Sequence, residues 1–102
     1  MAHATATAWV NTSTWQGGVR GQYWDPLADG NGVYLKYTVT SALVRAVDTL
    51  PTISSSAGKR SYTVDRALDK SYGAVDATVI VCAQMGWPIP DSCSDGTVRK
   101  TW

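Results

Sequence analysis

The side chains that could carry out acid–base or nucleophilic chemistry are few and poorly grouped in this 102-residue chain. Its single histidine, His3, is close to the N-terminus. A Ser-His-Asp or Cys-His device needs a positioned imidazole, which a terminal residue does not readily supply. The eight acidic residues are all aspartates, and most fall in predicted turns rather than in a pair suited to glycoside hydrolysis. We therefore predict a protein that is not an enzyme and has no catalytic residues.

Candidate metal ligands are incomplete as well. Asp25, Asp29 and Asn31 resemble part of a calcium-binding loop, but the full alternating pattern and the terminal glutamate are missing. The stretch 29–32 (DGNG) predicts a hairpin turn instead, because asparagine and glycine tolerate positive φ. The cysteines lack the additional ligands that zinc requires. We expect neither a metal nor a cofactor.

The two cysteines, Cys82 and Cys93, enclose a segment with an apolar tip and two prolines. A disulfide between them would close a loop of about a dozen residues and stabilise the fold by about 2–3 kcal/mol. A loop stiffened in this way loses less conformational entropy when it binds a partner. The predicted binding loop consists of Met85, Gly86, Trp87, Pro88, Ile89 and Pro90. In the alternative interpretation, Trp87 folds back over the sheet end and the disulfide only fixes strand ends.

Short strand-like runs separated by turn signals cover the chain, with no sustained helical period. Residues 33–40 alternate most clearly between apolar and polar side chains, and the apolar run at 74–81 predicts a central strand. The mixed polarity of 43–48 indicates an edge strand, and 67–72 could form a helical turn. Further strands are predicted at residues 5–12, 19–24, 59–66 and 97–102. Six or seven short strands indicate an all-β single domain over 1–102, a small antiparallel β-sandwich or barrel, of which we favour the sandwich.

Aromatic side chains are concentrated in the first 40 residues. Because the chain has no phenylalanine, some of them must fill the core, and Trp9 and Tyr37 are predicted there. Exposed tyrosine and tryptophan are frequent in protein interfaces and also offer flat platforms for sugar rings. The candidates for an exposed aromatic patch are Trp15, Tyr23, Trp24 and Tyr34. Ordinary sheet packing is the alternative for each.

The segments GVYLKY at 32–37, TVIVC at 78–82 and PDSCSD at 90–95 resemble small secreted actinobacterial (Streptomyces-like) proteins with one disulfide. In these proteins a DG-x-x-VYV-x-Y strand is followed by a V-x-V-C…PD-x-C-S close. The resemblance implies a single-disulfide β-sandwich, and it implies service as an adaptor of a secreted antibacterial toxin complex or as an inhibitor. CAQM at 82–85 is similar to the reactive loop of secreted subtilisin inhibitors, although those carry two disulfides.

Charge and hydropathy limit the location and the partners. With a formal net charge of +1 and no basic cluster, nucleic-acid binding is not expected. No apolar run reaches the length of a membrane span. Ala2-His3-Ala4 and Ala4-Thr5-Ala6 look like signal-peptidase sites, so residues 1–6 are interpreted as a flexible tail or the remnant of signal-peptide removal. The alternative is a natural alanine-rich N-terminus.

Together these patterns predict a secreted, non-enzymatic protein-interaction module with a protein partner. Two surfaces could serve it: the binding loop, and an N-terminal strand at residues 5–12 that adds to a partner's sheet. A carbohydrate-binding module that uses the exposed aromatic residues is one alternative. A serine protease inhibitor with Met85 near the specificity position is the other.

Overall fold

The alternation at residues 33–40 forms strand β4 (Gly32–Ser41), and the apolar run at 74–81 forms strand β8 (Ala74–Ala83). The two strands pair antiparallel, with Leu35 opposite Val81 and Tyr37 opposite Val79. Directly opposite residues share a face, so these side chains lie on one side of the sheet, where all four are buried. This apolar face is the centre of the hydrophobic core.

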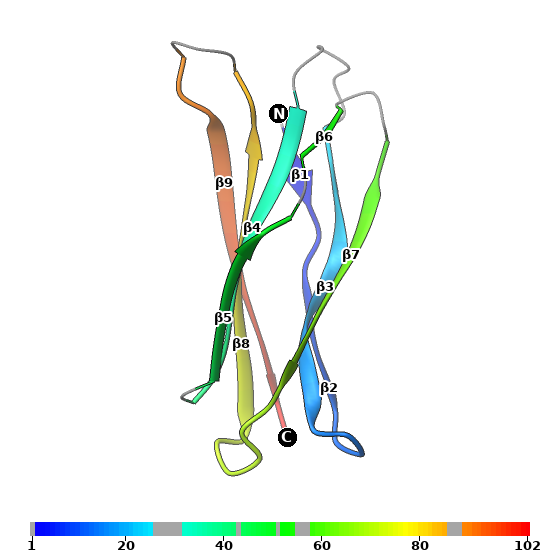
Figure 1. The fold of residues 1–102 in the computed structure, drawn as a ribbon, viewed down its shortest axis with the longest axis vertical. Coiled ribbons are helices and arrows are strands. Elements are labelled where there is room, and N and C mark those ends of the chain that lie inside the picture. The colour runs from blue at the N-terminus through cyan, green and yellow to red at the C-terminus, as the bar shows by residue number, and fades with distance from the viewer. Residues whose placement is uncertain (1, 26–31, 43, 51, 55–57, 86–88) are drawn as a thin grey trace.

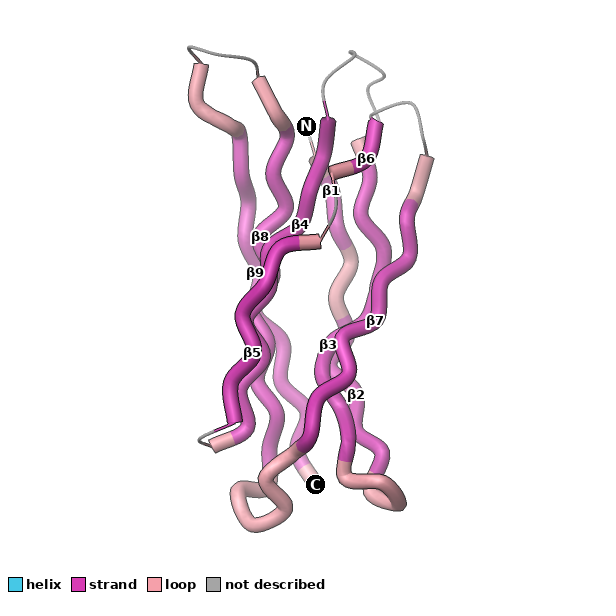
Figure 2. The backbone as a smooth tube through the Cα atoms, viewed as in Figure 1, coloured by secondary structure: helices cyan, strands magenta, loops and turns pink. Residues whose placement is uncertain are grey.

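The computed structural model describes residues 2–25, 32–42, 44–50, 52–54, 58–85 and 89–102. Within them the fold is all-β, with two antiparallel sheets packed face to face, which confirms the predicted sandwich (Figures 1 and 2). The strands besides β4 and β8 are β1 (His3–Ala4), β2 (Thr7–Asn11), β3 (Gln16–Trp24), β5 (Val44–Thr49), β6 (Ile53–Ser54), β7 (Arg60–Ala67) and β9 (Ser92–Thr101).

The two sheets differ in width. In one, β3 is central, with β1 and β2 following each other along one side and β7 on the other side. In the other, β4 has β5 and β6 along one side and β8 on the other, and β9 pairs with the far side of β8. Three rows of described strands therefore face four, and β9 is the outermost row of the wider sheet.

A glycine lets an aromatic side chain lie across the outer face of the narrower sheet. Trp9 is half-buried on the outer face, opposite Gly18, and its indole donates a hydrogen bond to the Val64 carbonyl oxygen at 3.2 Å. A Cβ on Gly18 would stand 2.2 Å from that oxygen. The prediction that Tyr37 is a core residue is confirmed, whereas Trp9 packs on the outside of the sheet because Gly18 leaves room there.

Two predictions of local structure differ most from the observed fold. The last strand begins at Ser92 rather than at residue 97, so Cys93 lies inside β9. Its exposed, mostly polar sequence gave no apolar alternation from which this start could be predicted. Residues 67–72 contain a turn closed by the Tyr72 amide and the Asp69 carbonyl oxygen, and no helix.

The contact at Gly18 predicts a large loss of stability for Gly18→Ala. The added methyl group would force β3 and β7 apart and lower the free energy of unfolding by about 2–3 kcal/mol, measured by urea denaturation of dilute protein. Gly96→Ala is the matched control, because a Cβ on that strand glycine meets nothing within 4 Å. Equal stability of the two variants would contradict this account of the packing.

Candidate functional site

The predicted disulfide is present between Cys82 and Cys93, which lie directly opposite each other on β8 and β9 with a Cα–Cα distance of 4.1 Å. This short separation is typical of a non-hydrogen-bonded antiparallel pair. The backbone groups of Cys93 therefore point away from β8. The Trp102 amide supports this assignment, since it bonds to the Gly73 carbonyl oxygen on the β8 side at 3.0 Å.

Backbone direction alternates along a strand, so every second residue of β9 presents its N–H and C=O to the free edge. The outward-facing residues are Cys93, Asp95, Thr97, Arg99 and Thr101. No described strand pairs with these groups. An edge of this kind is a template for another extended segment.

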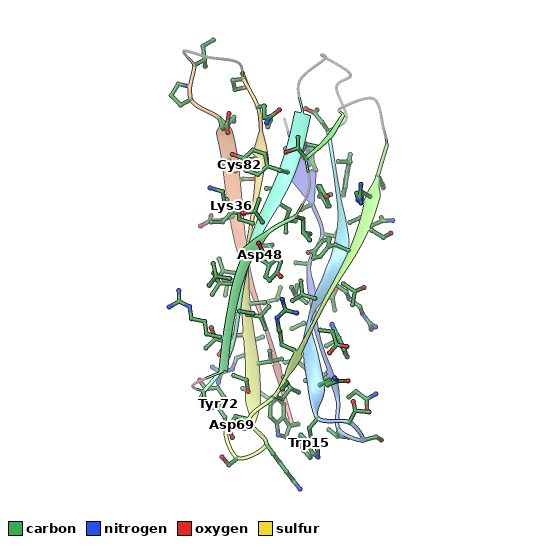
Figure 3. The ribbon with its side chains drawn as sticks, viewed as in Figure 1. Trp15, Lys36, Asp48, Asp69, Tyr72 and Cys82 are labelled. Atoms are coloured by element: carbon green, nitrogen blue, oxygen red, sulfur yellow. A yellow bond between two sulfur atoms is a disulfide. The ribbon has the colours of Figure 1, made fainter. Side chains whose placement is uncertain are left out.

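The described residues of the predicted binding loop, Met85, Ile89 and Pro90, lie between β8 and β9, beyond the disulfide (Figure 3). Met85 and Ile89 are exposed, with 39% and 57% of their surface accessible, and Pro90 is exposed as well. Gly86, Trp87 and Pro88 lie outside the described residues, as does the alternative in which Trp87 folds back. The described part of the tip is an apolar surface held on a covalently fixed hairpin.

Tyr34 fixes the base of this hairpin. Its hydroxyl donates a hydrogen bond to the Asp91 carboxylate, and the Lys36 ammonium lies 5.8 Å from its ring centroid. The hydrogen bond to Asp91, with a smaller contribution from burial, raises the pKa of Tyr34. Tyr34 is thus half-buried in a structural contact rather than fully displayed, and the sequence gave no signal that Asp91 would be its partner.

The four residues of the predicted aromatic patch do not share one surface. Tyr23 is buried in the core, where its ring packs edge-on against that of Tyr62, with 6.1 Å between the ring centroids. Trp15 lies in the β2–β3 turn, at the end of the molecule where the C-terminus lies (Figures 1 and 3), and its ring centroid is 5.8 Å from that of Trp102. Trp24 is at the other end of β3. An extended strand rises about 3.3 Å per residue, so Trp24 lies about 30 Å from Trp15. Tyr34 belongs to the other sheet.

A cleft of about 340 Å³ opens between the N-terminal segment and β9, and sequence reasoning missed it. Most of the side chains on its walls are small, and its floor is the core surface of β8. The lining residues are Ala2, His3, Ala4, Ala6, Val79, Val81, Ser94, Asp95, Gly96, Thr97 and Val98. The signal that could have revealed it is the alternation of alanine at positions 2, 4, 6 and 8, which is the pattern of a strand face built from small residues.

The N-terminal residues differ from the predicted flexible tail because that alanine face packs on the core. Ala2 is 5% exposed, and Ala4 and Ala6 are half-buried against the core. His3 and Ala4 pair with the end of β3, and the His3 ring stacks on Trp24 at 5.7 Å. The segment is therefore a wall of the cleft.

Tyr62 holds this wall in place. Its hydroxyl donates to the Thr5 carbonyl oxygen at 2.7 Å, at the break between β1 and β2. The intervening Gly21 permits the close approach, since a Cβ there would lie 2.0 Å from the same oxygen. Gln22 completes the junction by accepting from the Thr5 amide and donating to its hydroxyl.

The opposite opening of the sandwich, beside β7, is guarded differently. Arg66 lies on the inner face of β7, because it alternates with the exposed residues of that strand, and it is half-buried. Its guanidinium donates a hydrogen bond to the Tyr37 hydroxyl at 3.0 Å. An inward-pointing charge at an edge disfavours addition of a further strand. β9 has an inner-face charge as well, Lys100 opposite Val75, but this side chain is exposed and is not part of the cleft lining.

No protein-family model, curated protein or solved structure matches this chain. Among the described residues there is no cluster of three metal-ligating side chains and no helix long and apolar enough to cross a membrane. The fold and the edge geometry therefore define this protein as an all-β, disulfide-containing sandwich with one open, cleft-bearing edge.

The Tyr62 contact predicts a pH dependence. Burial raises the pKa of Tyr62 from 10.0 to about 12 in the folded protein, so the folded state holds this proton more tightly. The stability it contributes is fully present below pH 10 and is lost as the pH rises to about 12. Tyr62→Phe should flatten this part of the unfolding free-energy curve, measured by denaturant titration at each pH.

Tyr72→Phe, which removes an exposed hydroxyl, is the matched control for that measurement. Hydrogen exchange adds a local readout, because Tyr62→Phe should speed exchange of the Thr5 and Gln22 amides by loosening the N-terminal wall. A Tyr62→Phe curve as steep as that of wild type would contradict the assigned role.

Replacing both cysteines by alanine should lower the free energy of unfolding by about 2–3 kcal/mol, because the closed loop no longer restricts the unfolded chain. Guanidinium unfolding of Cys82→Ala/Cys93→Ala measures this loss. Thr78→Ala/Thr97→Ala is the matched control, since these residues also lie opposite each other on β8 and β9 and leave the disulfide intact. Equal losses in the two double variants would show that the disulfide has no special role.

Proposed function

We propose that this protein is a secreted, non-enzymatic interaction module that binds another polypeptide by adding an extended segment to the free edge of β9. The observation that carries the proposal is the combination, on one edge, of outward-facing backbone groups and a cleft beneath them. Strand addition takes its affinity from main-chain hydrogen bonds and its specificity from pockets for alternate side chains.

The unequal widths of the sheets support this use of the edge. Of the residues of β9, Val98 alone is half-buried and the rest are exposed, because the narrower sheet leaves most of the inner face of β9 uncovered. A strand added to β9 would continue the wider sheet and direct alternate side chains toward the cleft. Alanine, serine and glycine on the walls leave room for such side chains.

The hairpin tip supplies a second contact for the same partner. Met85 and Ile89 are exposed apolar side chains next to the start of β9, on a hairpin whose register the disulfide fixes. Because the disulfide fixes the hairpin that carries these two side chains, covering them costs less conformational entropy. A disulfide in so small a domain is consistent with an extracellular location, where such bonds persist.

Thr97→Pro tests the edge directly. Proline removes an N–H that faces the free edge rather than β8, so the fold should survive while strand addition is blocked. We expect affinity for a captured partner to fall by about tenfold or more, from the lost hydrogen bond and the clash of the ring. The partner is first isolated from the culture supernatant of the producing cells by a pull-down with tagged, oxidised protein. Surface plasmon resonance then measures the change in affinity.

Thr97→Ala is the matched control, because it keeps the N–H and should bind as the wild type does. Circular dichroism and thermal unfolding establish that both variants are folded. Unchanged binding by a folded Thr97→Pro variant would rule out the β9 edge as the binding element.

A further inference from the structure

We infer that the β9 edge accepts a second copy of this chain. The two β9 strands would pair antiparallel about a two-fold axis that passes between their Thr97 residues, a register described below as centred on Thr97. The inference rests on the proposed function, in that β9 must accept an extended segment, and it names the partner. The evidence is the order of charges along β9 and the position of its glycine.

Symmetry restricts the registers that are available. A two-fold axis perpendicular to the sheet keeps the outer faces of both copies on the same side, so outward-facing residues pair with outward-facing residues. In the register centred on Thr97, that residue faces its own counterpart and the two exchange both N–H···O bonds. Asp95 then faces Arg99 of the second copy, and the same backbone exchange occurs there.

Charge complementarity selects this register over its neighbours. With the axis at Thr97, two Asp95–Arg99 pairs form on the outer face of the joined sheet, one on each side of the axis. An axis at Gly96 would instead place Asp95 opposite Thr97, and an axis at Val98 would place it opposite Thr101. Opposite charges directly across a strand pair stabilise it, so the Thr97 register is preferred.

The Arg99 side chain is already held in a suitable position. Its Nε lies 3.4 Å from the Asp76 carboxylate on β8, and the side chain is 57% exposed. A guanidinium carries five N–H donors, so the remaining fork is free to bind a second carboxylate. Across the interface this produces a ladder of Asp76, Arg99 and Asp95 of the second copy on each side of the axis.

The inner face is complementary in shape. In the same register Gly96 faces Val98 of the second copy, and the reverse pair forms on the other side of the axis. A Cβ on Gly96 would meet nothing within 4 Å, so there is space beside it at the cleft mouth. Val98 of the second copy fills that space and extends the apolar surface formed by Val79 and Val81.

A charge-swap pair tests the inference on the intact protein. Asp95→Arg alone places arginine opposite Arg99 at both positions, and Arg99→Asp alone places aspartate opposite Asp95 at both. Each variant should dissociate about tenfold or more readily than the wild type, because like charges face each other across the strands. Mixed in equal amounts, the two variants should form a heterodimer in which both pairs between positions 95 and 99 have opposite charge.

Sedimentation equilibrium over a range of concentrations measures the association, and circular dichroism verifies that each variant is folded. In the wild type, exchange of the Asp95, Thr97 and Arg99 amides should slow as protein concentration rises. Gly96→Val is a further variant, because it fills the space that Val98 of the second copy needs and should weaken association.

The outcomes separate this inference from the proposed function. A wild type that stays monomeric, or a mixture of the swapped variants that fails to associate, overturns self-pairing, while the Thr97→Pro comparison still reports on strand addition by another partner. Association that Thr97→Pro and both charge variants leave unchanged overturns β9 as the contact between copies.

Discussion

The fold depends on packing a wider sheet against a narrower one. The inner residues of β4 and β8 are covered by β3 and its neighbours, which buries Val33, Leu35 and Val81 almost completely. The narrower sheet has no described row that covers all of β9, so that strand is joined through β8 but largely uncovered on its inner face. The open edge and the cleft both follow from this difference in width.

The narrower sheet compensates for its width by close backbone packing. Its central strand, β3, contains glycines where neighbouring backbone segments come close. Aromatic side chains cross the sheet at these glycines: Trp9 over Gly18 on the outer face, and Tyr62 over Gly21 on the inner face. The polar group of each aromatic side chain donates a hydrogen bond to a backbone carbonyl oxygen, so the indole N–H and the phenol O–H are not left without a partner inside the fold. The same Tyr62 bond that stabilises the sheet also positions the N-terminal wall of the cleft.

The sequence contained enough information for the fold class but not for the cleft. Strands with a clear apolar alternation, such as 33–40, were predictable because one face had to be buried. β9 was only partly predictable, because an exposed strand has no such face, and its pairing depends on Cys82 and Cys93 lying opposite each other. The alanines at positions 2, 4 and 6 were interpreted as a processing signal, since a small-residue strand face and a signal-peptidase site share one spacing.

Distance along the chain was the other limit. The aromatic residues of the first 40 positions looked like one group, but an extended strand separates its ends by about 3.3 Å per residue, so Trp15 and Trp24 lie far apart. The hydrogen-bond partner of Tyr34 is Asp91, and that of Tyr62 is Thr5. In both pairs the residues are 57 positions apart in the sequence. Such pairs arise from the topology, and no local pattern encodes them.

The charges on β9 have two physical effects that pull in the same direction. Charged side chains on an edge strand disfavour indiscriminate pairing, because most added segments would place an unpartnered or like charge opposite them. On β9 the charges Asp95 and Arg99 lie at equal distances from Thr97 and have opposite signs. A two-fold rotation that exchanges the Thr97 residues of two copies brings Asp95 opposite Arg99, so a second copy meets both of these outer-face charges with their opposites, while Lys100 on the inner face lies opposite Ser94. Charges that exclude most strands from an exposed edge can therefore also specify which strand it accepts.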